Sequence, residues 1–310
     1  LRRVRNPILL AQGILERGEG DLIPRGVKMG EGGRVEGGLD VPSAQGHEHI
    51  HGEAAEELAR QYGLEMVEAD YFWTRRRWEE HVRGLEREKD GRGVAGWCKT
   101  EFLPQGTVGA VAVDAEGVVC VATSTGGGGA GPVVELAGAL RGMVAECLTT
   151  PWLYSPLVGG QQGGGLVTTW SVAVSGTGNG DSFLRTAAAR TVAAMARFGG
   201  ESSAVALKKV TGLGGELQKS AGDRWGRTGE GEGGMIGIEC IVVRDAEGNV
   251  VEARSELLQD YNCGGMFRAW VDEKGVAFAR VFRDDEEVPE SFVGEGSAED
   301  IRHWSCEKLR

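Results

Sequence analysis

Residues 105–127 read Q-G-T-V-G-A-V-A-V-D-A-E-G-V-V-C-V-A-T-S-T-G-G, and this stretch decides the fold. Two apolar, largely β-branched runs, Val108–Val113 and Val118–Ala122, flank the polar turn D-A-E-G, which is the pattern of a buried β-hairpin. An antiparallel hairpin brings its open ends together. We therefore expect Thr107, just before the first strand, to lie beside Thr125, just after the second, so that one hydroxyl group can assist the other.

The same stretch resembles the autocleavage site of the plant-type L-asparaginases and isoaspartyl peptidases, which are N-terminal nucleophile hydrolases. The resemblance implies that the chain cuts itself between Gly106 and Thr107, so that Thr107 becomes an N-terminal nucleophile. A hydroxyl is a weak nucleophile until a base takes its proton, and a free α-amine with a pKa of roughly 7.7–8.0 can be that base. The resemblance gives Thr125 an orienting role and Thr123 a supporting one. On the hairpin alone, an ordinary strand threonine would be the favoured interpretation.

The resemblance extends along nearly the whole chain and is closest to fungal members. It includes V-x-N-P-I-x-L-A from residue 4, Y-F-x-T-x-R-R-W from residue 71 and N-C-G-G-M-F-R at residues 262–268. Hairpins with helices before and after them indicate an α+β fold of antiparallel sheets layered with helices, and the resemblance selects a four-layer αββα sandwich. It implies an α-chain portion at residues 1–106, which lacks the family's first strand and helix, and a β-chain that begins at the Thr107 nucleophile and runs to residue 310, and together they form one domain.

A second motif, V-S-G-T-G at residues 174–178, is expected where a strand leads into a helix. Backbone N–H groups at such a junction favour anions, and in acyl transfer the anion is the tetrahedral oxyanion. The resemblance assigns that role to the Thr177 side chain and the Gly178 N–H. A glycine-rich turn without a ligand is the alternative. A dinucleotide fingerprint is rejected, because Asp181 stands where its third glycine should be, although a nucleotide-binding module stays a remote hypothesis.

The resemblance fails at one functional point. Family members follow the hairpin with an arginine and an aspartate that hold the substrate's α-carboxylate and α-amine, a task that suits a bidentate arginine. Aligned back from Ser155-Pro156, those positions fall on Pro151 and Tyr154. Residues 128–154 read like a replaced exon or translated intron. A catalytically inactive relative is therefore the second hypothesis, beside an active hydrolase of L-asparagine or β-aspartyl peptides.

Length and composition limit the classes of protein. The 310 residues suit one large domain or two small ones. The net charge of −12 argues against a nucleic-acid partner, and no apolar run approaches the roughly 20 residues that span a bilayer. Six scattered cysteines without a C-x-x-C pair indicate reduced thiols and a cytoplasmic location. The chain begins with Leu1 instead of methionine, so we interpret it as a fragment of a longer protein or an incomplete gene model.

The expected partners are a small-molecule or short-peptide substrate and a second copy of the chain, because the resemblance implies a homodimer of αβ units. No cofactor is expected. The alternating histidines of His47–His51 could bind a metal on a strand, but a polar loop is the favoured interpretation, and no metal site is assigned.

Periodicity and turn residues predict further elements along the chain. Helices are expected at 4–16, 52–62, 71–85, 132–143 and 182–198. Strands are expected at 166–174, 235–243 and 250–253, and loops at 175–181 and 212–234.

Overall fold

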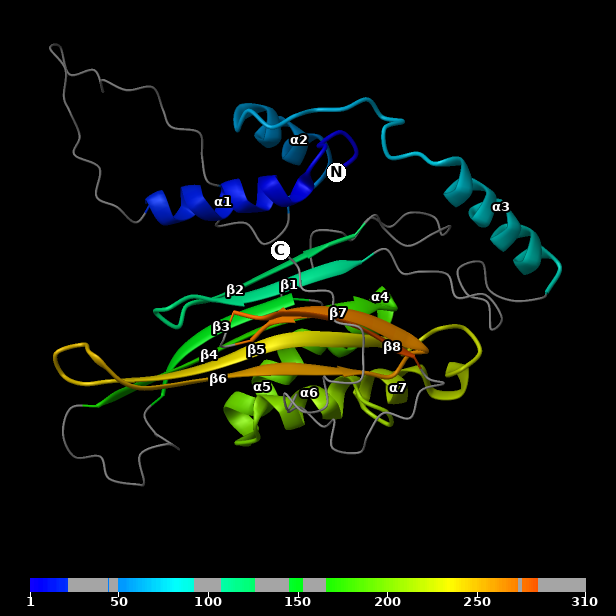
Figure 1. The fold of residues 1–310 in the computed structure, drawn as a ribbon. Coiled ribbons are helices and arrows are strands. Elements are labelled where there is room, and N and C mark those ends of the chain that lie inside the picture. The colour runs from blue at the N-terminus through cyan, green and yellow to red at the C-terminus, as the bar shows by residue number, and fades with distance from the viewer. Residues whose placement is uncertain are drawn as a thin grey trace, which may run out of the picture. The chain divides into compact units, whose positions relative to one another are not determined.

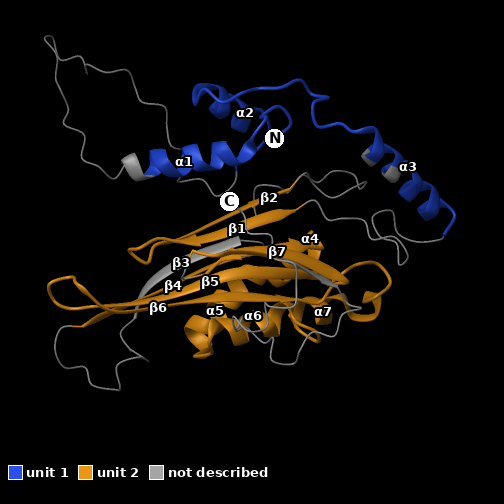
Figure 2. Ribbon diagram, viewed as in Figure 1, with its two compact units in different colours: residues 1–96, 129–139 blue, residues 97–128, 140–310 orange. Residues whose placement is uncertain are grey.

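The computed structural model describes residues 1–21, 44, 50–91, 107–125, 145–152, 166–272 and 275–283. The chain divides into two compact units (Figure 2). The first unit comprises residues 1–96 and 129–139, and the second comprises residues 97–128 and 140–310. The predicted division into an α-chain and a β-chain at residues 106 and 107 stays a prediction, because these units are defined by compactness alone.

The described part of the first unit contains three helices, α1 (Pro7–Asp21), α2 (Gly52–Gln61) and α3 (Arg75–Lys89). Helices were predicted in all three places, although α1 runs five residues beyond its expected end and α3 begins later than expected. An isolated bridge joins Val4 to Met66. A small apolar core includes Val4, Leu10, Ala55, Leu58 and Ala59. The helix predicted at 132–143 lies outside the described residues.

The predicted hairpin is confirmed in the second unit. Strand β1 (Val108–Val113) pairs antiparallel with β2 (Val119–Ser124). Gly117 closes the turn with a φ of +81°, a conformation that glycine adopts without the strain of a side chain. The Asp114 carboxylate accepts hydrogen bonds from the N–H groups of Glu116 and Val118, which fixes the turn.

A four-stranded antiparallel sheet is the centre of the second unit. Its strands are β3 (Ala145–Trp152), β4 (Val167–Gly178), β5 (Gly233–Arg244) and β6 (Val250–Tyr261), and they lie in that order. β5 and β6 form the second predicted hairpin, although both run longer than expected. β3 was not predicted. A separate two-stranded sheet joins β7 (Gly265–Val271) to β8 (Ala277–Arg283).

Four α-helices lie between β4 and β5 in the sequence: α4 (Gly180–Thr186), α5 (Ala188–Gly199), α6 (Ser203–Thr211) and α7 (Glu216–Ala221). The single helix predicted at 182–198 is wrong in one respect, because the chain breaks it at Ala187, whose φ is +45°. The prediction of an irregular loop at 212–234 is also wrong in part, since α7 and a short 3-10 helix, Gly222–Arg224, lie within it. α6 was not predicted.

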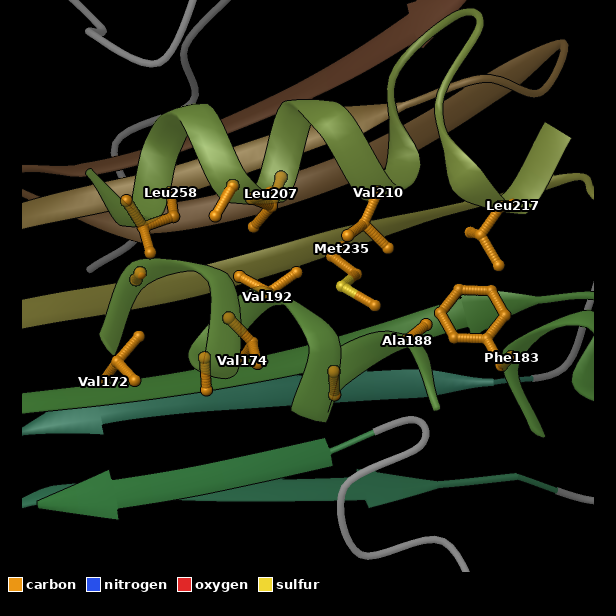
Figure 3. Close-up of a cluster of buried hydrophobic side chains, with 14 of the residues drawn as sticks. Val172, Val174, Phe183, Ala188, Val192, Leu207, Val210, Leu217, Met235 and Leu258 are labelled. Atoms are coloured by element: carbon orange, nitrogen blue, oxygen red, sulfur yellow. The ribbon is translucent and has the colours of Figure 1, made fainter. Parts of the chain in front are cut away.

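The two faces of β4 carry side chains of different size. Val172 and Val174 point into the large core between the sheet and the helices, together with Phe183, Val192, Leu207, Val210 and Met235 (Figure 3). Trp170 belongs to the same core. Alternate residues face the hairpin, and one of them, Ala173, packs with Val119, Ile238, Cys240 and Val242. The hairpin therefore covers one face of the sheet, and α5, α6 and α7 lie on the other (Figure 1).

In the described part of the second unit, the β1–β2 hairpin, the four-stranded sheet and a layer of helices thus lie one on another, and β7 and β8 form a further two-stranded sheet. This arrangement is consistent with the predicted α+β class. Among the described residues, no helix combines the length and apolarity needed to cross a lipid bilayer.

One buried carboxylate ties the helix layer to the sheet. Glu239 on β5 is 8% exposed and accepts hydrogen bonds from the Trp170 indole N–H and the Ser203 hydroxyl. Ser203 begins α6, so this contact fixes the start of that helix against the strands. Both donors compensate the carboxylate for the water that it loses on burial.

Cysteine labelling tests the placement of the hairpin over the sheet. Cys120 on β2 is exposed, whereas Cys240 on β5 is buried beneath the hairpin, and burial raises the pKa of the Cys240 thiol. Iodoacetamide at about pH 8, near the ordinary thiol pKa of roughly 8.5, should modify Cys120 in the folded protein and leave Cys240 unmodified. Peptide mass mapping reads the sites, and both should react in denaturant. Equal labelling in the native protein would contradict this packing.

A pair of phenylalanines tests the helix-side core. Phe183 is fully buried and Phe198 is 72% exposed. Phe183→Ala should lower the free energy of unfolding by about 3–5 kcal/mol, because the cavity cannot collapse fully. Phe198→Ala, the matched control, should change it by no more than about 0.5 kcal/mol. Urea denaturation of both variants measures the difference, and similar losses would show that Phe183 is not a core residue.

Candidate active site

The open end of the β1–β2 hairpin gathers the predicted threonines. Val108 pairs with Ser124 and Gly109 pairs with Thr123. Extending this register by one residue places Thr107 opposite Thr125. Thr107 is half-buried and Thr125 is exposed. The structure therefore brings these two residues to the same end of the hairpin, as the sequence predicted.

The end of β4 lies under this hairpin end and contributes two more hydroxyl groups. The Ser175 and Thr123 hydroxyl oxygens are 2.6 Å apart, so one hydroxyl donates a hydrogen bond to the other. The Thr177 hydroxyl donates to the backbone carbonyl of Thr107 at 3.5 Å, a long hydrogen bond. Ser175 is buried, and Thr177 is half-buried. Four hydroxyl-bearing residues thus meet where the hairpin and β4 end.

A glycine makes this meeting possible. A Cβ atom added to Gly109 would lie 2.0 Å from the Ser175 Oγ and 2.8 Å from its Cβ. Real Cβ atoms do not approach other atoms so closely, so any side chain at this position would push the hairpin away from β4. The sequence places glycine at the one point where the backbone of β1 rests on the Ser175 side chain.

The V-S-G-T-G motif differs from its prediction in secondary structure. Residues 175–178 were expected in a loop, but β4 continues to Gly178 because β5 pairs with it as far as Gly233. Asn179 caps α4, with its side-chain oxygen accepting the Ser182 N–H at 3.0 Å. The strand and the helix are therefore joined by this single capping residue.

Gly178 occupies a position that only glycine fits. Its φ is +147°. A Cβ atom there would lie 2.4 Å from the Glu232 carbonyl oxygen. The backbone leading into β5 therefore approaches this residue too closely for a side chain.

The ladder between β4 and β5 also sets the direction of the Gly178 N–H group. The N–H of Asn179 donates to the Glu232 carbonyl at 2.8 Å, on the side of β5. Successive N–H groups of a strand point to opposite edges, so the Gly178 N–H points toward the other edge. The pairing of β3 with β4 ends at Ala145 opposite Ser175, and the described strands leave the edge beyond Ser175 open.

Ser175 is the site residue that the sequence reasoning missed. A signal for it existed, because residues two apart on a strand share a face, and Ser175 therefore lies on the same face as Thr177. The cross-layer contact with Thr123 could not be read from that spacing, since it depends on how closely the hairpin packs.

Other residues singled out in the sequence contribute less to the site. Pro151 lies in β3 opposite Thr169, while Gly106 and Tyr154 lie outside the described residues. Of the histidine cluster, only His51 is described, and no group of three potential metal ligands occurs in the described part of the chain.

Fold and site together define a class of protein: an α+β structure that collects threonine and serine hydroxyls at the end of a hairpin packed on a sheet. A family model described as Asparaginase matches residues 40–133. An isoaspartyl peptidase of Escherichia coli K12 is 36% identical over 227 residues, 72% of this chain and 56% of the relative. An isoaspartyl peptidase of Salmonella typhimurium is 34% identical over 229 residues, 72% of this chain and 58% of the relative.

The chain belongs to this family of asparaginases and isoaspartyl peptidases. It spans less than three fifths of the length of these relatives. The expected likeness to fungal members stays a prediction.

The close approach of Gly109 to Ser175 yields a test with a rescue. Gly109→Ala should lower the free energy of unfolding by about 1–3 kcal/mol, because the new methyl group overpacks the contact. Adding Ser175→Gly removes the atoms that the methyl meets, so the double variant should lose less than the sum of the two single variants. Gly199→Ala is the control, since a Cβ atom at Gly199 meets nothing within 4 Å. Additive losses, measured by urea denaturation, would contradict the contact.

Proposed function

We propose that this chain is an autocleaving N-terminal-threonine amidohydrolase that acts on L-asparagine, on β-aspartyl peptides, or on both. The observation that supports it most is the convergence of Thr107, Thr123, Ser175 and Thr177 at the open end of the hairpin. The names of the bacterial relatives give the substrate class.

Self-cleavage comes first. The Thr107 hydroxyl oxygen attacks the carbonyl carbon of Gly106, and the peptide bond rearranges to an ester. That rearrangement breaks the bond to the Thr107 nitrogen and frees its α-amine. Water then hydrolyses the ester, which releases the carboxylate of Gly106 and restores the Thr107 hydroxyl. The Thr177 hydroxyl, bonded to the Thr107 carbonyl at 3.5 Å, holds this residue in place during the step.

Turnover uses the same threonine. The freed α-amine, with an ordinary pKa of roughly 7.7–8.0, takes the hydroxyl proton at neutral pH. The Thr107 oxygen attacks the β-carboxamide carbon of asparagine, ammonia leaves, and a β-aspartyl ester remains on the enzyme. Water hydrolyses this ester to aspartate. With a β-aspartyl peptide, the leaving group is the amine of the next residue.

The remaining groups support that chemistry. Thr125 orients the Thr107 hydroxyl, and Thr123 supports it with its partner Ser175. The Thr177 hydroxyl and the Gly178 N–H stabilise the oxyanion, where each such donor contributes roughly 2.7–4 kcal/mol. The direction of the Gly178 N–H, away from β5, supports this role.

The proposal includes the assembly that the family resemblance implies. A fourth layer of helices would complete an αββα sandwich, and two αβ units would form a homodimer. The cytoplasmic location stays a prediction from the cysteine pattern.

A second candidate function is a relative without hydrolytic activity on free substrate. Pro151 supports it, because a proline inside β3 cannot hold a substrate carboxylate as an arginine does. Tyr154, the other substituted position, cannot pair with an amine as an aspartate does. Such a protein could still cut itself, since self-cleavage needs no bound substrate.

Mass spectrometry and ammonia release separate these candidates. Purified protein held for a day at neutral pH should split between Gly106 and Thr107. Thr107→Ser should split as well, because a hydroxyl remains, whereas Thr107→Ala should stay intact and lose hydrolysis by several orders of magnitude. Ser255→Ala is the control, since this hydroxyl residue is exposed on β6, which β5 separates from β4.

The substrates distinguish the outcomes further. Release of ammonia from L-asparagine, or of aspartate from a β-aspartyl dipeptide, would establish turnover. Self-cleavage without either release would favour the second candidate. An uncut wild-type chain would overturn the proposal.

A further inference from the structure

Residues 231–233, which we call the glycine strap, run beside the end of β4 and are held by one buried side chain. Asn262 is 7% exposed. Its Oδ1 accepts the Gly233 N–H at 2.8 Å, and its Nδ2 donates to the Gly231 carbonyl at 2.9 Å. Its own backbone N–H donates to the Gly233 carbonyl at 3.0 Å. One asparagine therefore makes three hydrogen bonds to a segment of three residues.

The glycine strap in turn sets the end of β4. Its middle carbonyl, that of Glu232, accepts the Asn179 N–H at 2.8 Å. Gly178 pairs with Gly233, and a Cβ atom at Gly178 would lie 2.5 Å from the Cα of Gly233. Because both backbone groups of Gly233 bond to Asn262, neither of them draws the Gly178 N–H toward β5.

A second side chain holds the strap from the side of α4. The Ser182 hydroxyl accepts the Gly231 N–H at 2.8 Å and donates to the Asn179 Oδ1 at 2.7 Å. Asn179 itself bonds to Glu232, so the hydrogen bonds close a ring through Asn179, Ser182 and the strap. Asn262 stands outside this ring and fixes the strap from its other edge.

We infer that Asn262 is a positioning residue, which aims the Gly178 N–H at the reaction centre through the glycine strap. The catalytic part of this inference rests on the proposed function, because it takes Gly178 as an oxyanion donor. A donor stabilises the oxyanion only when it already points at it, so a small rotation of the strand end costs rate. Asn262 does not touch the substrate in this scheme.

Only a carboxamide satisfies both sides of the contact. The Gly233 N–H requires an acceptor, and the Gly231 carbonyl requires a donor. A carboxylate of the same shape would present oxygen to the Gly231 carbonyl, where two acceptors repel. Asn262→Asp therefore breaks one bond, keeps the other and leaves the volume unchanged.

Two measurements test the inference on the whole chain. Asn249→Asp is the matched control: it makes the same substitution and also breaks a side-chain hydrogen bond, the one to Asp245, but in the exposed β5–β6 turn at the opposite end of β5. Hydrogen–deuterium exchange, resolved at Asn179, reads the strand end without any need for activity. In Asn262→Asp the Asn179 N–H should exchange at least about tenfold faster, as loss of one buried hydrogen bond would produce.

Kinetics provide the second measurement. Hydrolysis by Asn262→Asp should show kcat lowered at least about tenfold, short of the roughly 10²–10³ that removal of a whole oxyanion donor costs, with KM little changed. A general loss of folded protein would lower the amount of active enzyme, and active-site titration of Thr107 corrects for it. The control variant should match wild type in both measurements.

The outcomes separate this inference from the proposed function. Unchanged exchange at Asn179 in Asn262→Asp would overturn the positioning role, whatever the activity. Faster exchange with unchanged kcat would show that the strap does not aim a catalytic group. A wild-type protein without hydrolysis would refute the proposed function alone, and the exchange result would still decide whether Asn262 positions the end of β4.

Discussion

The contact between the Gly109 backbone and the Ser175 side chain fixes how near the hairpin lies to the sheet, and the hydroxyl site depends on that spacing. Sheets packed face to face usually stand about 10 Å apart, which is farther than two short hydroxyl side chains reach. Thr123 and Ser175 nevertheless bond at 2.6 Å. A glycine on β1 and small side chains on the hairpin face of β4 permit this approach. The large buried side chains of β4, which are Trp170, Val172 and Val174, all lie on the opposite face, where they fill the core against the helices.

On the helix side of the sheet, glycines near the end of β4 also permit an unusually close contact. A Cβ atom at Gly176 would lie 2.3 Å from the Phe183 ring, and one at Gly233 would lie 2.5 Å from it. The fully buried ring of Phe183 thus lies directly against two strand backbones. A rigid, well-packed ring behind Gly176 and Gly233 supports the strand end from below, while Ser175 and Thr177 face the hairpin. At the end of β4, the face toward the helices therefore packs against the core, while the face toward the hairpin carries the hydroxyl groups of the candidate site.

The parts of this structure that local pattern determines could be predicted, and the parts that packing determines could not. The hairpin at 108–124 was predicted because alternation and turn chemistry are local, and the meeting of Thr107 with Thr125 follows from pairing alone. The hydrogen bond between Ser175 and Thr123 joins two layers, so it could not be predicted from the spacing of residues in the sequence. The break at Ala187 was missed because alanine is the best helix former. The helix α7 was missed because it has only six residues and lies between glycine-rich turns, so the whole stretch has the composition of a loop.

The proposed self-cleavage and the proposed turnover place different demands on this site. In self-cleavage the scissile carbonyl of Gly106 is attached to the nucleophile's own residue, so proximity is supplied by the covalent chain. In turnover a free amino acid must be held by charged groups, and Pro151 stands at one of the positions where such a group is expected. The hydroxyls and the Gly178 N–H come from one unit and from residues 107–178 alone. Loss of the substrate-holding groups would therefore remove turnover while leaving the machinery of self-cleavage intact, so that the two activities need not be lost together.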